Sequence, residues 1–472
     1  MYFCRQNYFS LTLIKSISGI RGTIGGVAKE NLTPLDIVKF TSAYGTWLLQ
    51  TNSTPIVVVG RDARISGEMV NRIVCGTLQS LGISVVDVGL STTPTVEIAV
   101  QMEEAGGGII LTASHNPKQW NALKLLNSKG EFLNTEEADT VLKIAEKENF
   151  EFALVDKLGD YQTKGFYIQK HIEKILELPL VDIEAIKERN FKIVIDCVNS
   201  TGGISVPELL VALGVTDTVE LFCSPNGRFP HNPEPLPEHL STISNEVKFQ
   251  KADLGLVVDP DVDRLAIVCE DGEFFGEEYT LVAIADYVLQ HKKGATVSNL
   301  SSTQALRDVS EKHGVVHAQS AVGEVNVVKK MKELNAVIGG EGNGGIIYPD
   351  LHYGRDALVG IALFLTHLAK FGKSCSMLRA QYPNYYMAKK KIDLPDSINV
   401  KALLKKIEEK YKSNPQNKED GLKIFLDNDW VHLRVSNTEP IIRIYTESNS
   451  QTTAENIAMK LMEDIKQLIN SK

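Results

Sequence analysis

The first third of the chain alternates short apolar runs with segments of helical periodicity. Continuous apolar and β-branched runs at 55–59, 83–88 and 108–111 predict strands that are buried on both faces of a parallel sheet. Between them, apolar residues recur at helical spacing over 67–81 and 97–103. Strands and helices in alternation predict an α/β domain with right-handed crossovers.

The same alternation returns further along the chain. Strand patterns at 191–196 and 254–258 enclose a helical pattern at 206–213, and a helical pattern at 278–290 opens a third series. These two series predict a second and a third α/β domain.

The order of elements changes after a basic triplet at 389–391. A helical pattern at 400–412 is followed by three strand patterns and a final helical pattern at 453–469, which predicts an α+β module. We therefore predict an α/β protein of three related α/β domains with mixed sheets plus a smaller C-terminal α+β domain around a central cleft. The predicted domains span residues 11–160, 161–273, 274–388 and 389–472.

Composition restricts the class of protein. With 43% hydrophobic and 23% charged residues, the composition of the 472-residue chain is typical of a globular protein. Its net charge of −9 argues against a general nucleic-acid or membrane-surface binder. The six cysteines form no C-x-x-C pair, which is typical of a reducing compartment. The longest apolar helical stretch, 357–369, is short of the roughly 20 residues that span a bilayer. We expect a cytoplasmic protein without nucleic-acid or membrane partners.

A serine loop follows the third strand pattern. Residues 112–117 read Thr-Ala-Ser-His-Asn-Pro. This loop places the hydroxyl of Ser114 at the carboxyl end of a sheet, where α/β proteins bind ligands. Serine is a weak nucleophile unless a base or a metal activates it. Asn-Pro is also a turn signal, so a plain turn is the alternative.

Carboxylates alternate in the loop at 259–264, which reads Asp-Pro-Asp-Val-Asp-Arg between two strand patterns. Such carboxylates can converge on a hard cation, and Mg²⁺ takes few of them together with phosphate. Glu270 at the twelfth position also imitates a calcium-binding helix-loop-helix. Arg264 stands where that loop needs glycine, and strands flank the loop, which favours a catalytic metal site over a calcium loop or a solvated acidic turn. The three candidate ligands are Asp259, Asp261 and Asp263.

A glycine-rich turn lies at 339–345. Its five glycines let the backbone approach a ligand closely, and Glu341 and Asn343 can bond sugar hydroxyls. The turn lacks the Gly-Lys-Ser/Thr ending of a nucleotide P-loop, so it does not indicate ATP binding.

A polar loop at 434–440 separates two strand patterns of the last module. Arg434, Ser436, Asn437 and Thr438 supply a guanidinium, two hydroxyls and an amide, which suit a phosphate. A decorated hairpin loop is the alternative.

Taken in order, these segments resemble the α-D-phosphohexomutases, which include phosphoglucomutases, phosphomannomutases and phosphoglucosamine mutases. The resemblance covers nearly the full chain, from Gly-Ile-Arg-Gly at 19–22 to the loop at 434–440. It includes Gly-Arg-Asp-Ala-Arg at 60–64 and Asn-Ala-Leu-Lys at 121–124. The serine loop and the aspartate loop together are its most specific part.

The resemblance implies a role for each matched residue. Ser114 is expected to be phosphorylated, and its phosphate with the three aspartates to hold one Mg²⁺ per chain. Arg264 and Arg21 are expected to stabilise charge on the transferring group, and Lys124 to act as acid/base. The implied catalytic residues are Ser114, Lys124, Arg264, Arg21 and His115. The implied substrate-binding residues are Glu341, Asn343, Glu324, Arg434, Ser436, Asn437 and Thr438, with the loop of Arg434 on the phosphate that does not react.

The implied reaction moves phosphate between the 6- and 1-positions of a hexose or hexosamine, through a hexose 1,6-bisphosphate that is both intermediate and activator. Glucosamine phosphate is the first choice of substrate, because segments 18–22 and 340–344 together resemble bacterial chains assigned that way. Glucose and mannose phosphates are the alternatives, and a Mg²⁺-dependent sugar phosphatase and a silent sugar-phosphate-binding protein are two further classes. Asn343, Gly345 and Glu324 stand where many relatives have Ser, His and His, which affects substrate choice and proton transfer.

Overall fold

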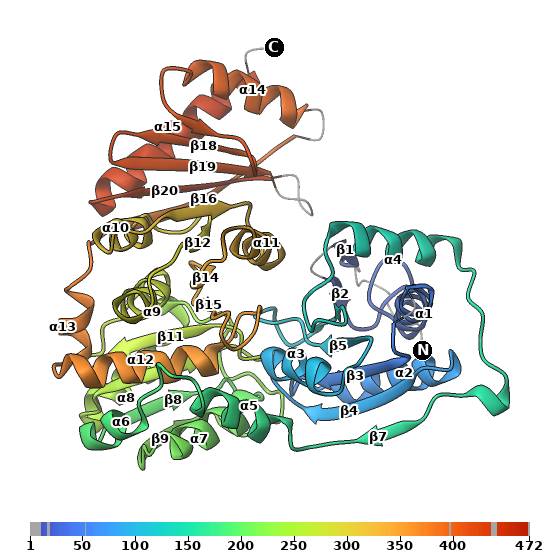
Figure 1. Ribbon diagram of the computed structural model, residues 1–472. Helices are drawn as coiled ribbons and strands as arrows, with labels where there is room; N and C mark the ends of the chain where they lie inside the picture. Colours follow the sequence, from blue (N-terminus) through green and yellow to red (C-terminus); the bar gives the residue numbers. More distant parts are fainter. Residues whose placement is uncertain (1–10, 17–18, 52, 396–397, 436–440, 471–472) are drawn as a thin grey trace, which may run out of the picture. The chain divides into compact units, whose positions relative to one another are not determined.

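The computed structural model describes residues 11–16, 19–51, 53–395, 398–435 and 441–470. The chain divides into two compact units, the first formed by Met1–Thr280 with Gly345–Ser376 and the second by Leu281–Gly344 with Met377–Lys472. The division falls within α9 (Glu277–His291) and α13 (Cys375–Arg379) (Figure 1).

A seven-stranded mixed sheet organises the first part of the first unit. Its strands lie in the order β1-β2-β6-β5-β3-β4-β7, with β5, β3, β4 and β7 parallel and β1, β2 and β6 joined antiparallel. The strands are β1 (Ile14–Ser16), β2 (Gly19–Thr23), β3 (Ile56–Arg61), β4 (Ser84–Leu90), β5 (Gly107–Leu111), β6 (Trp120–Leu126) and β7 (Tyr161–Thr163). The helices are α1 (Pro34–Gln50), α2 (Gly67–Ser80), α3 (Thr93–Met102) and α4 (Thr135–Lys147).

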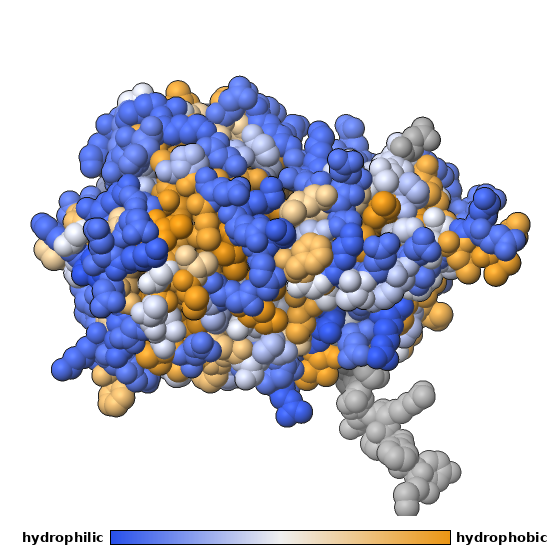
Figure 2. Space-filling model, turned by 60° about the horizontal axis from the view of Figure 1, so that its bottom comes forward, coloured by the Kyte–Doolittle hydropathy of each residue, from blue (hydrophilic) through white to orange (hydrophobic). Residues whose placement is uncertain are grey.

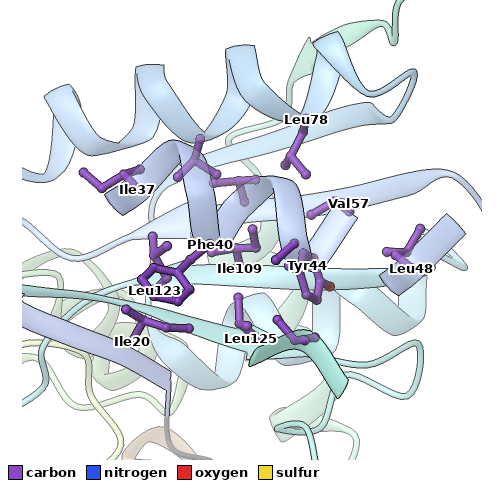
Figure 3. Close-up of a cluster of buried hydrophobic side chains, with 14 of the residues drawn as sticks. Ile20, Ile37, Phe40, Tyr44, Leu48, Val57, Leu78, Ile109, Leu123 and Leu125 are labelled. Carbon is purple, nitrogen blue, oxygen red and sulfur yellow. The ribbon is translucent and has the colours of Figure 1, made fainter. Parts of the chain in front are cut away.

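Burial on both faces explains why β3 and β5 read as unbroken apolar runs. Val57 and Ile109 pack into one core with Phe40 and Tyr44 of α1, as Figure 3 shows. Val58 and Ile110 belong to a second core, to which α3 contributes Val96, Ala99 and Val100. Successive strand residues point to opposite faces, so the sheet is covered on both sides.

A four-stranded sheet with the order β11-β10-β8-β9 forms the second part of the first unit. Three strands are parallel, while β10 and β11 form an antiparallel hairpin. Its strands are β8 (Lys192–Asp196), β9 (Asp217–Leu221), β10 (Leu254–Val258) and β11 (Leu265–Cys269). The first unit also contains β15 (Gly345–Ile347), which is not part of this sheet. Its helices are α5 (Tyr167–Leu176), α6 (Ile183–Arg189), α7 (Gly202–Ala212), α8 (Ser241–Gln250) and α12 (Ala357–Phe371). The hairpin presents the aspartate loop, since Val258 pairs with Leu265 across it.

The second unit contains parallel strands in the order β13-β12-β14 and a five-stranded antiparallel sheet in the order β16-β20-β19-β18-β17. The parallel part comprises β12 (Thr296–Asn299), α10 (Ala305–Lys312), β13 (His317–Ser320), α11 (Glu324–Leu334) and β14 (Ile338–Glu341). The antiparallel part comprises β16 (Tyr386–Asp393), α14 (Val400–Lys410), β17 (Gln416–Asn417), β18 (Leu422–Leu426), β19 (Asp429–Val435), β20 (Ile441–Ser448) and α15 (Gln451–Asn470). Buried Lys423 joins the two parts, because its Nζ donates to the carbonyl of Leu300 at 2.7 Å and lies 4.0 Å from the ring centroid of Trp430.

The predicted fold class is confirmed: the chain contains three α/β domains with mixed sheets and a C-terminal domain. The domain boundaries given above remain a prediction. Hydrophilic side chains alternate with smaller apolar areas over the face in Figure 2, as on ordinary globular proteins. Among the described residues, no helix combines the length and the apolar character that crossing a bilayer requires.

Candidate active site

The serine loop presents a strained, nearly buried hydroxyl. Ser114 follows β5 and has a left-handed backbone with φ of 49°, which is uncommon for a residue other than glycine and typical of functional sites. Its Oγ donates to Asp259 Oδ2 at 2.9 Å and lies 3.4 Å from His115 Nδ1. The nucleophile predicted from sequence therefore lies against the first aspartate of the predicted metal loop, 145 residues away.

A buried ion pair fixes this loop. Arg64 Nε donates to Asp62 Oδ2 at 2.8 Å, and neither side chain is exposed. The guanidinium also donates to the carbonyls of Ser114, Pro117 and Trp120. Asp62 in turn accepts a hydrogen bond from Thr112 Oγ1 at 2.7 Å. The segment at 60–64, matched by resemblance without a role, thus holds the backbone on both sides of the serine.

The three aspartates converge as the alternating spacing predicts. They are fully buried, and one oxygen of each lies within 4.8 Å of the others. Val262 between them has φ of 62°, an outlier for a β-branched residue, and its carbonyl accepts a hydrogen bond from the backbone N–H of Ala357. The calcium alternative is wrong, because strands β10 and β11 flank the loop and Glu270 instead accepts from Ser376 at the start of α13.

Two observations fit this triad to a divalent cation. First, Asp261 Oδ1 and Asp263 Oδ1 are buried and accept no hydrogen bond from any residue that the structure describes. Second, burial and the neighbouring Asp263 and Asp261 raise the pKa of Asp259 well above its usual range, as expected when carboxylates lie close together in a buried site. Buried carboxylate oxygens of this kind are ligands for a hard ion such as Mg²⁺.

Lys124 lies on β6, the strand antiparallel to β5, and is 8% exposed at its side chain. Its Nζ donates to Asp261 Oδ2 at 2.7 Å and lies 3.6 Å from Asp263 Oδ2. Burial works to lower the pKa of Lys124, but the two carboxylates outweigh it and raise the pKa. The structure thus favours the charged amine, the acid form of a general acid/base.

Three guanidiniums complete the positive side of the site. Arg264 Nη1 lies 3.6 Å from Glu234 Oε1, and burial and the charge of Arg264 lower the pKa of Arg21 on β2. The third is Arg355, whose Nη2 donates to Asp263 Oδ2 at 2.7 Å. Sequence reasoning missed Arg355, because a lone arginine 92 residues from its partner carries no local pattern.

His115 lies among these cations. Burial and the charges of Arg264, Arg21 and Arg355 hold the pKa of His115 well below its ordinary value. A neutral imidazole beside Ser114 can accept a proton, whereas an imidazolium would add to the positive charge. The first unit therefore brings together all the predicted catalytic and metal-ligating residues.

The second unit brings together most of the predicted substrate-binding residues. Glu341 Oε1 accepts from Asn299 Nδ2 at 2.9 Å and from the backbone N–H of Gly323 at 3.0 Å, which places the glycine-rich turn beside Glu324 at the start of α11. Asn343 lies in the same turn, between β14 and Gly344.

Arg434 joins this set through Asp420, which sequence reasoning also missed. Asp420 Oδ2 forms an ion pair with Arg434, 2.8 Å from its Nε, and accepts a hydrogen bond from the backbone N–H of Val322 at 3.0 Å. The other predicted residues of this loop, Ser436, Asn437 and Thr438, lie outside the described residues.

Comparisons with known proteins cover the same regions. Segments match the phosphoglucomutase/phosphomannomutase alpha/beta/alpha domains I, II and III and the C-terminal domain at residues 14–152, 169–272, 276–386 and 390–464. A phosphoglucomutase/phosphomannomutase from Thermococcus kodakarensis is 37% identical over 453 residues, which cover 94% of this chain and 98% of that protein. A phosphoglucosamine/phosphogalactosamine mutase from Sulfurisphaera tokodaii is 32% identical over 464 residues, 96% of this chain and 99% of that protein.

A solved structure gives the same result. The crystal structure of a phosphoglucomutase/phosphomannomutase family protein from Burkholderia thailandensis has a TM-score of 0.83 at 26% identity and covers 98% of each chain. A serine against a carboxylate triad, surrounded by cations, suits phosphoryl transfer, which depends on positioning and charge neutralisation. With all four domains matched, the chain belongs to the phosphoglucomutase/phosphomannomutase family. It is a phosphohexomutase, an isomerase that acts on sugar phosphates.

Proposed function

We propose that this phosphohexomutase interconverts glucosamine 6-phosphate and glucosamine 1-phosphate, with Ser114 as the phosphoryl carrier and Mg²⁺ on the three aspartates. The observation that carries the carrier assignment is the 2.9 Å hydrogen bond from Ser114 Oγ to Asp259 Oδ2. Ser114 carries the only side-chain hydroxyl in segment 113–117, and this hydrogen bond holds that hydroxyl against the carboxylate of Asp259.

Each half-reaction exchanges one phosphorus–oxygen bond for another. The bond from phosphorus to Ser114 Oγ breaks while a bond to a sugar hydroxyl oxygen forms, giving the 1,6-bisphosphate. The sugar hydroxyl loses a proton and Ser114 Oγ gains one. After the sugar turns over, the serine takes the other phosphoryl group back by the reverse exchange, so no phosphate is released.

The residues around the serine supply the remaining requirements. Bound at the aspartates, Mg²⁺ would neutralise charge on the phosphoryl oxygens. Lys124, held charged beside Asp261, is placed to deliver and recover a proton. Arg21, Arg264 and Arg355 provide fixed positive charge, because guanidiniums bind phosphoryl oxygens well.

We assign recognition of the rest of the substrate to the second unit. Glu341, Glu324 and Asn343 offer polar groups for sugar hydroxyls, and the loop of Arg434 offers a grip for the second phosphate. Asp420, which contacts both the 322–324 segment and Arg434, supports a common function for these residues.

The choice of glucosamine phosphate rests on the resemblance of segments 18–22 and 340–344, because the names of the relatives are divided. The Sulfurisphaera tokodaii protein is named for glucosamine and galactosamine phosphates, whereas the Thermococcus kodakarensis protein is named for glucose and mannose phosphates. Turnover of glucosamine 6-phosphate, glucose 1-phosphate and mannose 1-phosphate in parallel decides between them. We expect the highest kcat/KM for glucosamine 6-phosphate, and a preference for either of the other two would overturn the assignment.

The carrier is tested separately. Intact-mass measurement of the freshly purified protein should show molecules with one additional phosphate, and Ser114→Ala should remove both that species and turnover. Thr112 follows the same strand but donates to Asp62, so Thr112→Ser should keep the phosphorylated species. Activity of Ser114→Ala near that of the natural enzyme would refute the carrier role.

A further inference from the structure

A second buried cluster of ionisable side chains lies in the first unit, outside the site described above. It comprises His171, His352, Asp356 and Glu97, none more than 2% exposed at its side chain. Asp356 Oδ2 lies 2.8 Å from His171 Nε2 and 3.3 Å from His352 Nε2. His352 Nδ1 lies 3.2 Å from Glu97 Oε2.

The cluster joins three segments that are distant in sequence. Glu97 belongs to α3, His171 to α5, and Asp356 caps α12 by accepting from the backbone N–H groups of Leu358 and Val359. Thr95 of α3 also contacts His171 Nδ1 at 2.9 Å.

Two of these segments contact the aspartate loop within four residues of the cluster. On α3, Thr93 Oγ1 donates to Asp261 Oδ2 at 2.6 Å. Before α12, Arg355 donates to Asp263 Oδ2 at 2.7 Å, and the next N–H after Asp356 donates to the carbonyl of Val262 at 3.1 Å. The cluster therefore fixes the segments that touch two of the three aspartates.

We propose that His171 and His352 are positioning residues for phosphoryl transfer: they hold Asp356, and through it Arg355 and the start of α12, against the aspartate loop. A buried carboxylate needs donors, and without them it reorients or becomes protonated. The two imidazoles supply those donors from one side, while the N–H groups of α12 supply them from the other. Close packing supports this, because a Cβ on Gly354 would lie 1.8 Å from Glu97 Oε2.

A metal site is the alternative interpretation, since His171, His352 and Asp356 are grouped closely enough to coordinate one ion. The hydrogen bonds argue for positioning. Every ring nitrogen of the two histidines already has a protein partner within 3.3 Å, and Asp356 Oδ1 is engaged by the helix. Burial works to lower the pKa of His352, but Asp356 and Glu97 raise it to about 10, which matches an imidazolium between two carboxylates.

The inference rests on the proposed cation role of the aspartates, and kinetics on the full chain test it. His171→Leu removes the donor to Asp356, whereas His171→Gln keeps one. We expect His171→Leu to lower kcat at least about tenfold, with the sugar-phosphate KM within about twofold, and to raise the Mg²⁺ concentration for half-activation. His171→Gln should recover most of kcat. Ile172→Ala, a buried change on the same helix, is the matched control and should lower the melting temperature without changing the Mg²⁺ requirement.

A double-mutant cycle separates positioning from general destabilisation. If the histidine acts through Arg355, His171→Leu should add less than about a twofold loss of kcat in an Arg355→Ala background. Should His171→Leu not fold, Thr95→Val removes the contact to His171 Nδ1 and should move kcat and the Mg²⁺ requirement in the same direction.

Several results would overturn the proposal. One is full additivity of His171→Leu and Arg355→Ala in the double-mutant cycle. Another is an unchanged kcat in folded His171→Leu or Thr95→Val. The third is a transition metal bound at one equivalent per chain that is lost when His171 is replaced. An enzyme that needs no Mg²⁺ would instead refute the proposed function of the aspartates.

Discussion

Replacing Lys124 by methionine should lower the stability of the metal-free protein but raise its affinity for Mg²⁺. The change keeps an unbranched side chain of similar length and removes one charge. The ammonium lies 2.7 Å from Asp261 Oδ2 and 3.6 Å from Asp263 Oδ2, and all three side chains are buried. The variant therefore leaves Asp261 without its ion-pair partner, while Asp263 loses one cation and keeps Arg355 at 2.7 Å.

The magnitudes follow from these distances. Unit charges 4 Å apart interact by about 4 kcal/mol at an effective dielectric constant of about 20. Removing one member of a buried ion pair typically costs about 3–5 kcal/mol, because the remaining charge is left unpaired. Without metal, we expect Lys124→Met to lose stability in that range. The same change removes a positive charge that repels Mg²⁺, so Mg²⁺ affinity should rise at least about tenfold, equal to about 1.4 kcal/mol. Loss of a general acid/base should lower kcat by about 10²–10⁴-fold.

The assays are thermal unfolding with and without Mg²⁺, calorimetric Mg²⁺ titration, and steady-state kinetics at saturating Mg²⁺. Added Mg²⁺ should stabilise the variant more than the natural enzyme, because ligand binding stabilises the folded state in proportion to affinity. Lys423→Met is the matched control, since Lys423 is equally buried but contacts Leu300 and Trp430; it should lose stability without a change in Mg²⁺ affinity. A weaker Mg²⁺ affinity in Lys124→Met, or a kcat within tenfold of the natural enzyme, would refute the reasoning.

Three further predictions concern the metal, the second phosphate and the buried histidine. Asp261→Asn should weaken Mg²⁺ binding and lower kcat, and Ca²⁺ should replace Mg²⁺ poorly because it prefers longer, looser coordination; calorimetry and initial rates with each ion check both. Arg434→Ala should lower kcat/KM at least about tenfold, since a charge-assisted contact contributes about 1.5–3 kcal/mol, while Ser114 stays phosphorylated; unchanged constants would mean that the loop is only a decorated hairpin. Because the pKa of His352 is raised to about 10, its stabilisation is complete below its unfolded pKa of about 6.5 and is lost as pH rises through about 10. The difference in unfolding free energy between the natural protein and His352→Leu should therefore shrink from pH 6.5 to 10, and a constant difference would contradict the charge assignment.

The apolar pattern predicted the central parallel strands because these strands are buried on both faces. It did not predict β6, since Asn121 and Lys124 interrupt its apolar residues although the strand is almost wholly buried. It also could not predict β7, whose three residues are exposed and which pairs with β4 at the edge of the first sheet. The start of α3 was predicted four residues too late, at residue 97 instead of Thr93. The first turn of this helix consists of Thr93, Pro94 and Thr95 and has no apolar residues at helical spacing.

For the candidate site, too, only residues that form a local sequence pattern could be predicted. Ser114 and the aspartates were predictable because each set lies within one short loop with a characteristic spacing. Thr93 and Arg355 were not, because they reach the aspartate loop across 168 and 92 residues. Their roles depend on how the sheets and α12 pack, and no local pattern of residue types records that packing.

The charges of the site explain why the aspartates and the cations are found together. Lys124 and Arg355 are engaged by Asp261 and Asp263, although the proposed function assigns both of them a part in phosphoryl transfer. They become fully available to a phosphate only when the carboxylates have another positive partner. Arg21 and Arg264 contribute further positive charge in the same region. Four cations thus lie close to the three buried aspartates and to Glu234, although burial and the neighbouring aspartates raise the pKa of Asp259. A divalent cation and a doubly charged phosphoserine would enter this arrangement together without changing its net charge, which is the electrostatic condition for holding a phosphorylated serine in a buried site.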